Sequence, residues 1–387
     1  MRAVRHPGEL RWETRLLAVV VATLVVFGIV AVYGASSMTE ESGRIVGHRF
    51  ALTQLTGAAF GGVLLIIASQ VDYYYWRRLA WPLLLLTIAL LLIPVLPFTE
   101  AIAPERNGAR RWILIGPASF QPSELARLAV VVWCAMLATK KGDRVREFRK
   151  GVLPFVSVLA LVFLLVLLQP NLSMALLITM LGGVVLFAAG AKIGHFLILL
   201  MVGTVLAYNR IEGAQYRLAR VVTWLGGGGG DEQGGGFQIG QSIMGFGSGQ
   251  FFGLGLGEGQ QKLGYLPYAY SDFVFSSIGE EWGFLGVCVL LALYATFCWL
   301  GFRIARTTSE PFGQLLAIGL TVAVGLTAFM HMAVNLGMMP TTGLTLPFVS
   351  FGRSSLVITL LGAGVLINIG RMRGKPRAAP VRRPDER

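Results

Sequence analysis

The chain has 387 residues, of which 55% are hydrophobic and only 14% charged, with a mean hydropathy of +0.66. An ordinary soluble domain carries about 25% charged residues, so this composition excludes a disordered chain, a disulfide scaffold and almost any soluble enzyme. The 33 Lys and Arg against 20 Asp and Glu give a net charge of +13. The position of this excess along the chain decides whether it indicates nucleic-acid binding or membrane topology.

Long apolar runs recur along the chain and predict membrane-spanning helices, each of which needs about 20 mostly apolar residues. Ten segments qualify: 16–34, 51–69, 79–97, 123–139, 152–169, 172–190, 194–209, 282–302, 312–336 and 354–370. Helices are the expected spanning form, because lipid offers no partners to backbone polar groups and these runs exceed the length of barrel strands. The predicted fold class is therefore all-α, a polytopic membrane protein with about ten transmembrane helices. A large extracytoplasmic loop is expected between helices 7 and 8.

The positive charge concentrates on one side of these spans. The segments on the side of the N-terminus hold 22 of the 33 basic residues but 8 of the 20 acidic ones. Since Lys and Arg concentrate in cytoplasmic segments, we expect both termini in the cytoplasm, where the basic residues meet anionic membrane lipid. Nucleic acid is not an expected partner. We divide the chain into a cytoplasmic tail (1–15), a ten-helix membrane domain (16–370) and a basic cytoplasmic tail (371–387).

The predicted loop over about 210–275 carries three sequence patterns. Residues 216–225 place apolar side chains at helical spacing beside Arg and Trp, which predicts an amphipathic helix in the membrane interface. Residues 226–236 are mostly glycine and predict a flexible linker. The later glycines, such as Gly245 and Gly253, predict tight turns or close backbone approach. No Gly-Lys-Ser/Thr follows them, so a phosphate-binding loop is not expected.

Three polar clusters interrupt the apolar pattern, and ionisable side chains at membrane depth are costly and usually functional. The first cluster contains Arg110, Arg111, Glu124 and Arg127. Glu124 and Arg127 are three residues apart and share one face of a predicted helix. Their spacing fits either an internal ion pair or a cationic pocket near the outer surface for an anionic headgroup.

The second cluster precedes and enters the predicted eighth span. Asp272 lies there among aromatic and apolar residues, which makes its carboxylate a candidate general base. A helix N-cap is the equally weighted alternative. Glu280 and Glu281 stand near a helix N-terminus, where negative charge is stabilised, and a structural role is expected for them.

The third cluster combines Asn335 with the segment 340–355, in which Pro, Gly and hydroxyl residues lie between apolar flanks. This composition predicts a broken or re-entrant segment, which is tolerated only where it is buried in protein or lines a cavity. Arg353 could bind a phosphate there or pair with an outside acid. His331, in the predicted ninth span, is expected to form an interhelical hydrogen bond.

Taken together, these motifs resemble the SEDS family (shape, elongation, division and sporulation), the ten-span polymerases of bacterial peptidoglycan. The matching motifs follow family order from about residue 16 to 370. They are Asn107-Gly108-Ala109-Arg110-Arg111-Trp112, Gln121-Pro122-Ser123-Glu124, Gln169-Pro170, Gln241-Ser242, Gly255-Leu256-Gly257 with Gln261-Lys262, Tyr265-Leu266-Pro267, Asp272-Phe273, Gly279-Glu280-Glu281, and Pro340 through Ser355. The spacing from Gln241 to Asp272 is closer to the division member of the family than to its elongation member.

The resemblance implies polymerisation of lipid II, an undecaprenyl-pyrophosphate-linked disaccharide pentapeptide, on the outer face of the bacterial cytoplasmic membrane. A role in septal wall synthesis is expected. The implied partners are a class B penicillin-binding protein, which is a crosslinking transpeptidase, and other division proteins. The family's essential aspartate matches Asp272, and its intramembrane lysine matches Arg127. The clusters and motifs together give as substrate-binding candidates Arg111, Glu124, Arg127, Gln241, Lys262, Arg353, Ser354 and Ser355.

Several positions depart from the family pattern. The family sequence Pro-Glu-x-His-Thr-Asp reads Pro267-Tyr268-Ala269-Tyr270-Ser271-Asp272, so a Glu and a His are missing. Asn171 stands where the family has an aspartate, Thr342 where it has a lysine, and Arg353 where it has a glycine. We hypothesise that Arg353 replaces the basic charge lost at Thr342.

In the expected reaction, Asp272 takes the proton of a sugar 4-hydroxyl as it attacks an anomeric carbon, with inversion. Arg127, Arg111, Arg353 or a divalent cation, Mg²⁺ or Mn²⁺, would neutralise the pyrophosphate leaving group. No cofactor is firmly assigned, and no metal-ligand spacing is present. The alternatives are a lipid II flippase, for which internal repeats would be expected, an elongation-type polymerase, and a scaffold that only positions the transpeptidase.

Overall fold

The computed structural model describes residues 9–37, 40–41, 44–45, 47–105, 108–116, 118–197 and 235–373. Ten α-helices are described within these ranges: α1 (Glu9–Ser36), α2 (Gly47–Gln70), α3 (Tyr74–Leu92), α4 (Pro122–Lys141), α5 (Leu153–Leu168), α6 (Leu172–Ala188), α9 (Gly235–Gly249), α10 (Val274–Thr307), α11 (Pro311–Asn335) and α12 (Arg353–Met372). Short helical turns cover Ile93–Val95, Pro97–Thr99, Gly142–Arg146 and Phe148–Val152. Two small antiparallel hairpins, β1 (Glu40–Glu41) with β2 (Arg44–Ile45) and β3 (Ile113–Ile115) with β4 (Ala118–Phe120), are the exceptions to the helical fold.

Eight of the described helical segments are long and apolar enough to cross a membrane. Helix α6, with 17 residues, is a shorter apolar helix. The protein is therefore an integral membrane protein of helical fold, as its composition predicts. The predicted span 194–209 lies mostly outside the described residues, as do 216–225 and most of the tail 371–387, so the count of ten spans stays a prediction. The division of the chain into tails and one membrane domain stays a prediction as well.

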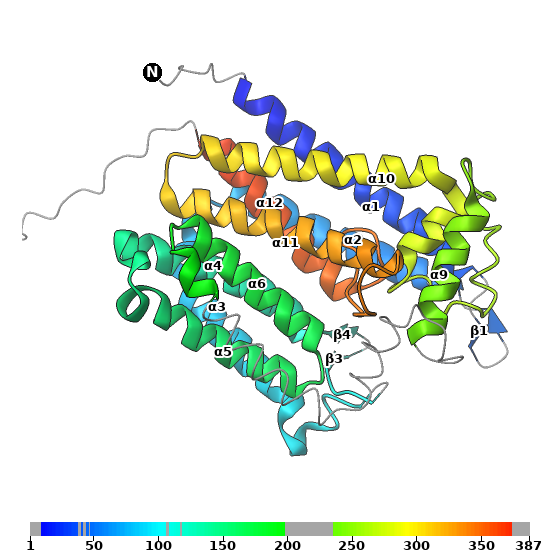
Figure 1. Ribbon diagram of the computed structural model, residues 1–387, viewed down its shortest axis with the longest axis horizontal. Coiled ribbons are helices and arrows are strands. Elements are labelled where there is room, and N and C mark those ends of the chain that lie inside the picture. Colours follow the sequence, from blue (N-terminus) through cyan, green and yellow to red (C-terminus); the bar gives the residue numbers. More distant parts are fainter. Residues whose placement is uncertain are drawn as a thin grey trace, which may run out of the picture.

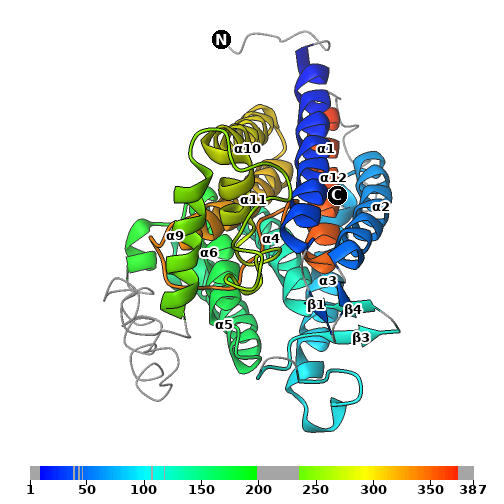
Figure 2. The same ribbon diagram turned by 90° about the vertical axis from the view of Figure 1, so that its right-hand side faces the viewer.

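The long helices lie side by side along the long axis of the molecule (Figure 1). Helix α2 packs extensively along α12, and α10 packs along α11. The hairpins, α9 and the segment that leads into α12 gather at one end, whereas α1 begins at the opposite end (Figures 1 and 2). We call the end that carries α9 the loop end of the bundle.

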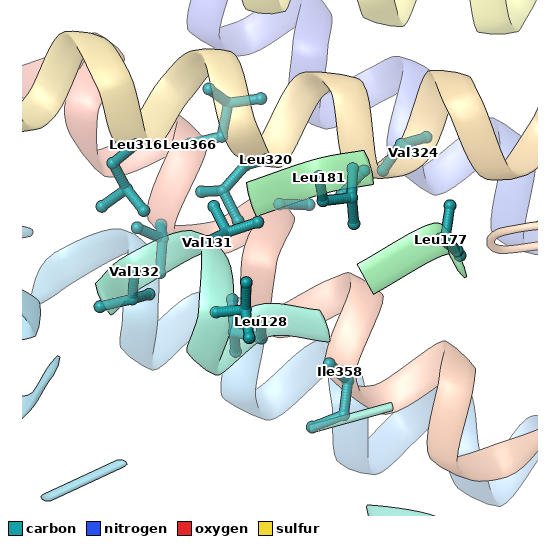
Figure 3. Close-up of a cluster of buried hydrophobic side chains, with 14 of the residues drawn as sticks. Leu128, Val131, Val132, Leu177, Leu181, Leu316, Leu320, Val324, Ile358 and Leu366 are labelled. Atoms are coloured by element: carbon teal, nitrogen blue, oxygen red, sulfur yellow. The ribbon is translucent and has the colours of Figure 1, made fainter. Parts of the chain in front are cut away.

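The core of the bundle lies where α4, α6, α11 and α12 meet (Figure 3). Leucine, valine and isoleucine side chains fill it, among them Leu128, Val131, Leu177, Leu181, Leu316, Leu320, Val324, Ile358 and Leu366. Because lipid tails are as apolar as these side chains, close van der Waals fit holds such helices together rather than the exclusion of water. Helix α4, which carries Glu124 and Arg127, is consequently the most enclosed of the candidate spans.

The glycines of the predicted loop show both expected roles, close backbone approach and tight turns. Gly245 lies inside helix α9, where a Cβ would stand only 2.8 Å from Ser276 Oγ of α10. This glycine therefore permits a close approach of two helices rather than a turn. Gly253 adopts a φ of +82° and forms a turn, as expected.

Helix α10 is interrupted near the loop end. Gly283 has a φ of +64° and a ψ of −164°, which breaks the helical hydrogen bonding around it. The chain just after α9 supplies the lost partners through four hydrogen bonds of 2.9 to 3.2 Å: Leu254 N to Glu280 O, Gly255 N to Glu281 O, Phe284 N to Gln250 O and Leu285 N to Phe251 O. The loop before Asp272 is thereby attached to the helix that follows Asp272.

The α2–α12 interface gives a direct test of this packing. A Cβ at Gly364 of α12 would stand 2.5 Å from Leu65 O and 3.0 Å from Ala68 Cβ of α2. We expect Gly364→Ala to lower the free energy of unfolding by about 1–3 kcal/mol, because a well-packed contact becomes overfilled. Gly62→Ala on α2 is the matched control, since its Cβ would meet nothing within 4 Å. Thermal unfolding in detergent measures both, and equal melting temperatures for the two variants would contradict the packing.

Candidate active site

Asp272 lies in the turn that leads into α10, at the loop end, and is half-buried. Its amide donates to the carbonyl of Tyr268 over 3.0 Å, and its own carbonyl accepts from Asn335 Nδ2 over 3.0 Å. Tyr268 itself has a φ of +59°, a conformation that a tyrosine adopts only at some cost. On the other side, a Cβ placed on Gly343 would be 3.7 Å from Asp272 Oδ2. The carboxylate is therefore held against the segment that joins α11 to α12.

The Asn335 side chain connects three elements around Asp272. This residue ends α11 and is fully buried. Its Nδ2 also donates to His331 O over 2.9 Å, and its Oδ1 accepts from Ser276 N of α10 over 3.1 Å. Its carbonyl accepts from Ser242 Oγ of α9 over 2.7 Å. Asn335 belongs to a polar cluster in the sequence, but its role could not be predicted there, because its partners other than His331 are 59 to 93 residues away in sequence.

The segment 336–352 is non-helical and lies folded against the Asp272 turn. Ser350 Oγ donates to Ser271 O over 2.6 Å and accepts from Leu346 N over 2.8 Å. Phe351 N donates to Tyr270 O over 3.0 Å. This arrangement fits the predicted broken segment, whose freed backbone groups find partners inside the protein.

Two polar side chains at membrane depth support this segment from neighbouring helices. Gln54 of α2 is fully buried; its Nε2 donates to Ser350 O over 3.0 Å, and its Oε1 accepts from Gly352 N over 3.3 Å. His331 of α11 contacts Leu344 O through Nδ1 over 2.7 Å, so its partner is a carbonyl of the segment 336–352 and not the second helix that the sequence predicts. Gln54 is absent from the sequence-based candidates, although a lone glutamine in an apolar helix is a detectable signal.

Aromatic packing places Arg353 in the same region as Asp272. Tyr270 and Phe351 each precede one of these residues by two positions, and both rings pack against Phe50 of α2 with centroid distances of 4.3 and 5.1 Å. Tyr270 stands where the family has a histidine, so an aromatic contact occupies that position here. The Arg353 stem lies on Gly57, and no hydrogen bond or ion pair to its guanidinium is found among the described residues.

Hydroxyl groups connect this region to α4. Ser354 Oγ, at the start of α12, accepts from Gln121 N and donates to Ser119 O, both over 3.2 Å. Ser355 Oγ accepts from Thr345 Oγ1 over 3.0 Å. The two serines predicted to bind substrate therefore also fasten α12 to the β4–α4 junction and to the segment 336–352.

Arg127 and Glu124 form a buried ion pair with an N–O distance of 3.1 Å. Only 5% of Arg127 and 2% of Glu124 are exposed. Arg127 also donates to Thr359 Oγ1 of α12 over 2.9 Å and to Thr327 Oγ1 of α11 over 3.4 Å. Of the two alternatives left open by the sequence, this geometry favours the internal ion pair, which here joins three helices. Contact of Arg127 with a substrate headgroup stays a prediction.

The remaining predicted substrate residues lie in two other places. Arg111 donates to the carbonyls of Gln169 and Pro170 in the α5–α6 turn, where a cation is favourable beside the C-terminus of α5. Lys262 is enclosed, and its Nζ lies 3.2 Å from Glu281 Oε1 and 3.3 Å from Gly34 O of α1. Gln241 is half-buried on α9. Direct substrate contact by these residues stays a prediction.

Glu280 and Glu281 have the structural role that the sequence predicts for them. Glu280 Oε1 accepts from Gln260 N over 2.8 Å and from Gln261 N over 3.3 Å. Glu281 neutralises Lys262 in a contact from which water is nearly excluded. Both acids thus fix the loop ahead of Asp272 onto α10.

The described residues contain no group of three or more His, Cys, Asp or Glu side chains that could hold a metal ion. A divalent cation at the pyrophosphate stays a prediction.

The Glu124–Arg127 pair can be tested through stability. We expect Arg127→Met to lower the free energy of unfolding by about 3–5 kcal/mol, because it leaves the Glu124 carboxylate buried without its partner. The double variant Glu124→Gln with Arg127→Met removes both charges and should recover most of that loss. Detergent-based unfolding of the three proteins measures the difference. A single variant as stable as the double variant would show that the pair is not buried.

Comparisons with known proteins agree with this architecture. The family profile described as cell cycle protein, which covers FtsW, RodA and SpoVE, matches residues 14–375. A protein named as a probable peptidoglycan glycosyltransferase FtsW from Geobacter sulfurreducens is 39% identical over 367 residues, which cover 95% of this chain and 97% of that protein. Stage V sporulation protein E of Bacillus subtilis is 35% identical over 356 residues, which cover 92% of this chain and 96% of that protein.

Two solved structures have a similar fold. A chain of a peptidoglycan synthase complex that coordinates polymerization and crosslinking has a TM-score of 0.77 and 28% identity, and the match covers 93% of this chain and 98% of that chain. The rod shape determining protein RodA of Thermus thermophilus has a TM-score of 0.67 and 28% identity, and the match covers 93% and 97%. The resemblance stated from the motifs is therefore confirmed. The chain belongs to the FtsW/RodA/SpoVE family of cell cycle proteins, the SEDS family.

Proposed function

We propose that this protein is a peptidoglycan glycosyltransferase that polymerises lipid II into glycan strands. One observation carries the proposal: hydrogen bonds at Tyr268 and Asn335 hold the backbone of Asp272, and Ser350 holds the neighbouring Ser271. Packing of Tyr270 and Phe351 on Phe50 brings into the same region Arg353, which has no hydrogen bond or ion pair among the described residues. A held carboxylate and a cation in one region are what transfer of a sugar from a pyrophosphate requires. The names of the similar FtsW proteins support the same activity.

The reaction needs one proton acceptor and one site of positive charge. As the 4-hydroxyl oxygen of one disaccharide bonds to the anomeric carbon of the other, its proton passes to the Asp272 carboxylate. The bond from that carbon to the pyrophosphate oxygen breaks, and the electron pair leaves with undecaprenyl pyrophosphate. Attack from the opposite face inverts the anomeric carbon. Pyrophosphate needs neutralisation rather than protonation, and we assign this role to Arg353, to which no hydrogen bond or ion pair is found among the described residues.

The proposed topology follows from the charge distribution. With the basic segments in the cytoplasm, the loop end and Asp272 face outward, where lipid II is polymerised. We assign the protein to the bacterial cytoplasmic membrane with both termini inside. A class B penicillin-binding protein is the proposed partner. Septal synthesis is the proposed role, since several of the similar proteins are named FtsW. The similarity to a chain of a peptidoglycan synthase complex supports a crosslinking partner.

We expect Asp272→Asn to lower the rate of lipid II polymerisation by about 10²–10⁴-fold, because the amide cannot accept the proton. Asp72→Asn makes the same chemical change at the start of α3, and this control should keep wild-type activity. The assay uses purified protein with its partner and labelled lipid II in detergent. Detergent leaves no membrane to cross, so polymer formed there separates a polymerase from a flippase. A polymerising Asp272→Asn variant would refute the assignment of the base.

Asn335 is proposed as a positioning residue, and a second buried asparagine provides a matched control. Asn368 of α12 makes the same kinds of hydrogen bond at the other end of the bundle, from Tyr73 N over 2.8 Å and to Ser69 O over 2.9 Å. Both alanine variants should lose about 1–3 kcal/mol of stability. We expect Asn335→Ala alone to lower kcat, by about tenfold, with KM unchanged. If Asn368→Ala lowered kcat equally, the effect would be one of stability and not of positioning.

A further inference from the structure

A second group of charged and aromatic side chains lies at the end of the bundle opposite Asp272. Glu13 of α1 is 1% exposed and forms ion pairs with Arg303 of α10 and with Arg373, just after α12. Arg373 also donates to Thr307 Oγ1 over 2.6 Å. One acid therefore joins the ends of three helices, and this group takes no part in the proposed reaction.

Arg303 lies between two partly exposed tryptophans. Its guanidinium carbon is 5.3 Å from the ring centroids of both Trp12 and Trp299, distances typical of cation–π contacts. Trp12 is 39% exposed and Trp299 50% exposed. Tryptophan is enriched at the boundary between hydrocarbon and water, so these rings place Arg303 at the depth of lipid headgroups.

A hollow of about 420 Å³ opens beside this pair of rings. Its lining residues are Trp299, Phe302, Arg303, Arg306 and Thr307 of α10. Arg306 is exposed, and no hydrogen bond or ion pair to it is found among the described residues. The charges of Glu13, Arg303, Arg306 and Arg373 sum to +2, and Arg303 and Arg306 are the two that line the hollow. Trp299 and Phe302 add an apolar floor.

We propose that this hollow binds the phosphate headgroup of an anionic phospholipid, with Arg303 and Arg306 as the phosphate ligands. A guanidinium fork matches phosphate oxygens, and the acyl chains would lie along Trp299 and Phe302. In the proposed topology this lipid belongs to the cytoplasmic leaflet. A partner helix in the same place would cover the Arg306 charge without neutralising it unless it brought an acidic residue of its own. The assignment rests on the contact of α1 with α10 and is independent of the proposed enzymatic activity.

The test uses the full chain in nanodiscs that contain equal amounts of phosphatidylglycerol and phosphatidylcholine. Native mass spectrometry after extraction gives the ratio of the two lipids retained on the protein. We expect phosphatidylglycerol to be enriched on the wild type, and Arg306→Gln to lower the ratio about fivefold, as for the loss of one interfacial cation. This variant leaves the Glu13 ion pairs in place, so it should fold. Trp299→Leu should lower the ratio as well.

Arg78→Gln is the matched control, because Arg78 is also exposed and lies near a ring, 5.8 Å from the Tyr75 centroid. It belongs to the first turns of α3, at the end of that helix that the proposed topology puts on the same side. This variant should leave the ratio unchanged. An equal loss in Arg78→Gln and Arg306→Gln would mean general attraction to a charged surface and would overturn the site. If phosphatidylglycerol were not enriched on the wild type, the lipid site would be refuted and a protein neighbour would be the alternative occupant of the hollow. If inorganic phosphate raised the melting temperature in detergent as much as phosphatidylglycerol, a free anion would be the ligand instead.

Discussion

Backbone hydrogen bonding is the constraint on which the rest of this structure depends. Inside a membrane protein, a chain that leaves the helical conformation must find partners for its N–H and C=O groups within the protein. The break at Gly283 is paired with the loop 250–255, and the segment 336–352 is paired through Gln54, Ser350 and His331. Asp272 lies against the segment 336–352, and its backbone is held by hydrogen bonds to Tyr268 and Asn335, so the residues that support this irregular segment also support the turn that carries the carboxylate.

The charged side chains in the described part of the molecule fall into two groups, those that join helices and those assigned to the reaction. Glu124 with Arg127, Glu281 with Lys262, and Glu13 with Arg303 and Arg373 are buried or largely buried groups that join elements distant in sequence. Removing one member of such a group lowers the free energy of unfolding by more than the intact group contributes to it, because a buried charge is then left without water or a partner. Asp272 and Arg353 are half-buried by contrast. The structure thus separates the enclosed charges that maintain the bundle from the two to which we assign the chemistry.

The sequence predicts the helices well and the site only in part, for physical reasons. In a membrane, a single apolar run of this length can satisfy its own backbone N–H and C=O groups only as a helix. Helices such as α4 and α11 therefore follow directly from the sequence. The three-residue spacing of Glu124 and Arg127 allows an ion pair, but the burial that favours it over an open pocket comes from Thr327 and Thr359 on two other helices. The hydrogen bonds around Asp272 could not be predicted, because Asn335 is 63 residues from Asp272 in sequence and Gln54 is 296 residues from Ser350. Gly245 is a similar case. It lies in a helix and allows close contact with Ser276 on α10, a contact that the glycine-rich sequence does not indicate.

The central claim is that Asp272 receives the proton of the attacking hydroxyl while Arg353 lies at the pyrophosphate. A structure of the full chain with a non-reactive lipid II analogue tests it most directly. The account predicts an acceptor 4-hydroxyl within about 2.6–3.2 Å of an Asp272 carboxylate oxygen, with the pyrophosphate in contact with the Arg353 guanidinium. An acceptor hydroxyl placed against another carboxylate, or a headgroup bound at the end where α1 begins, would contradict it.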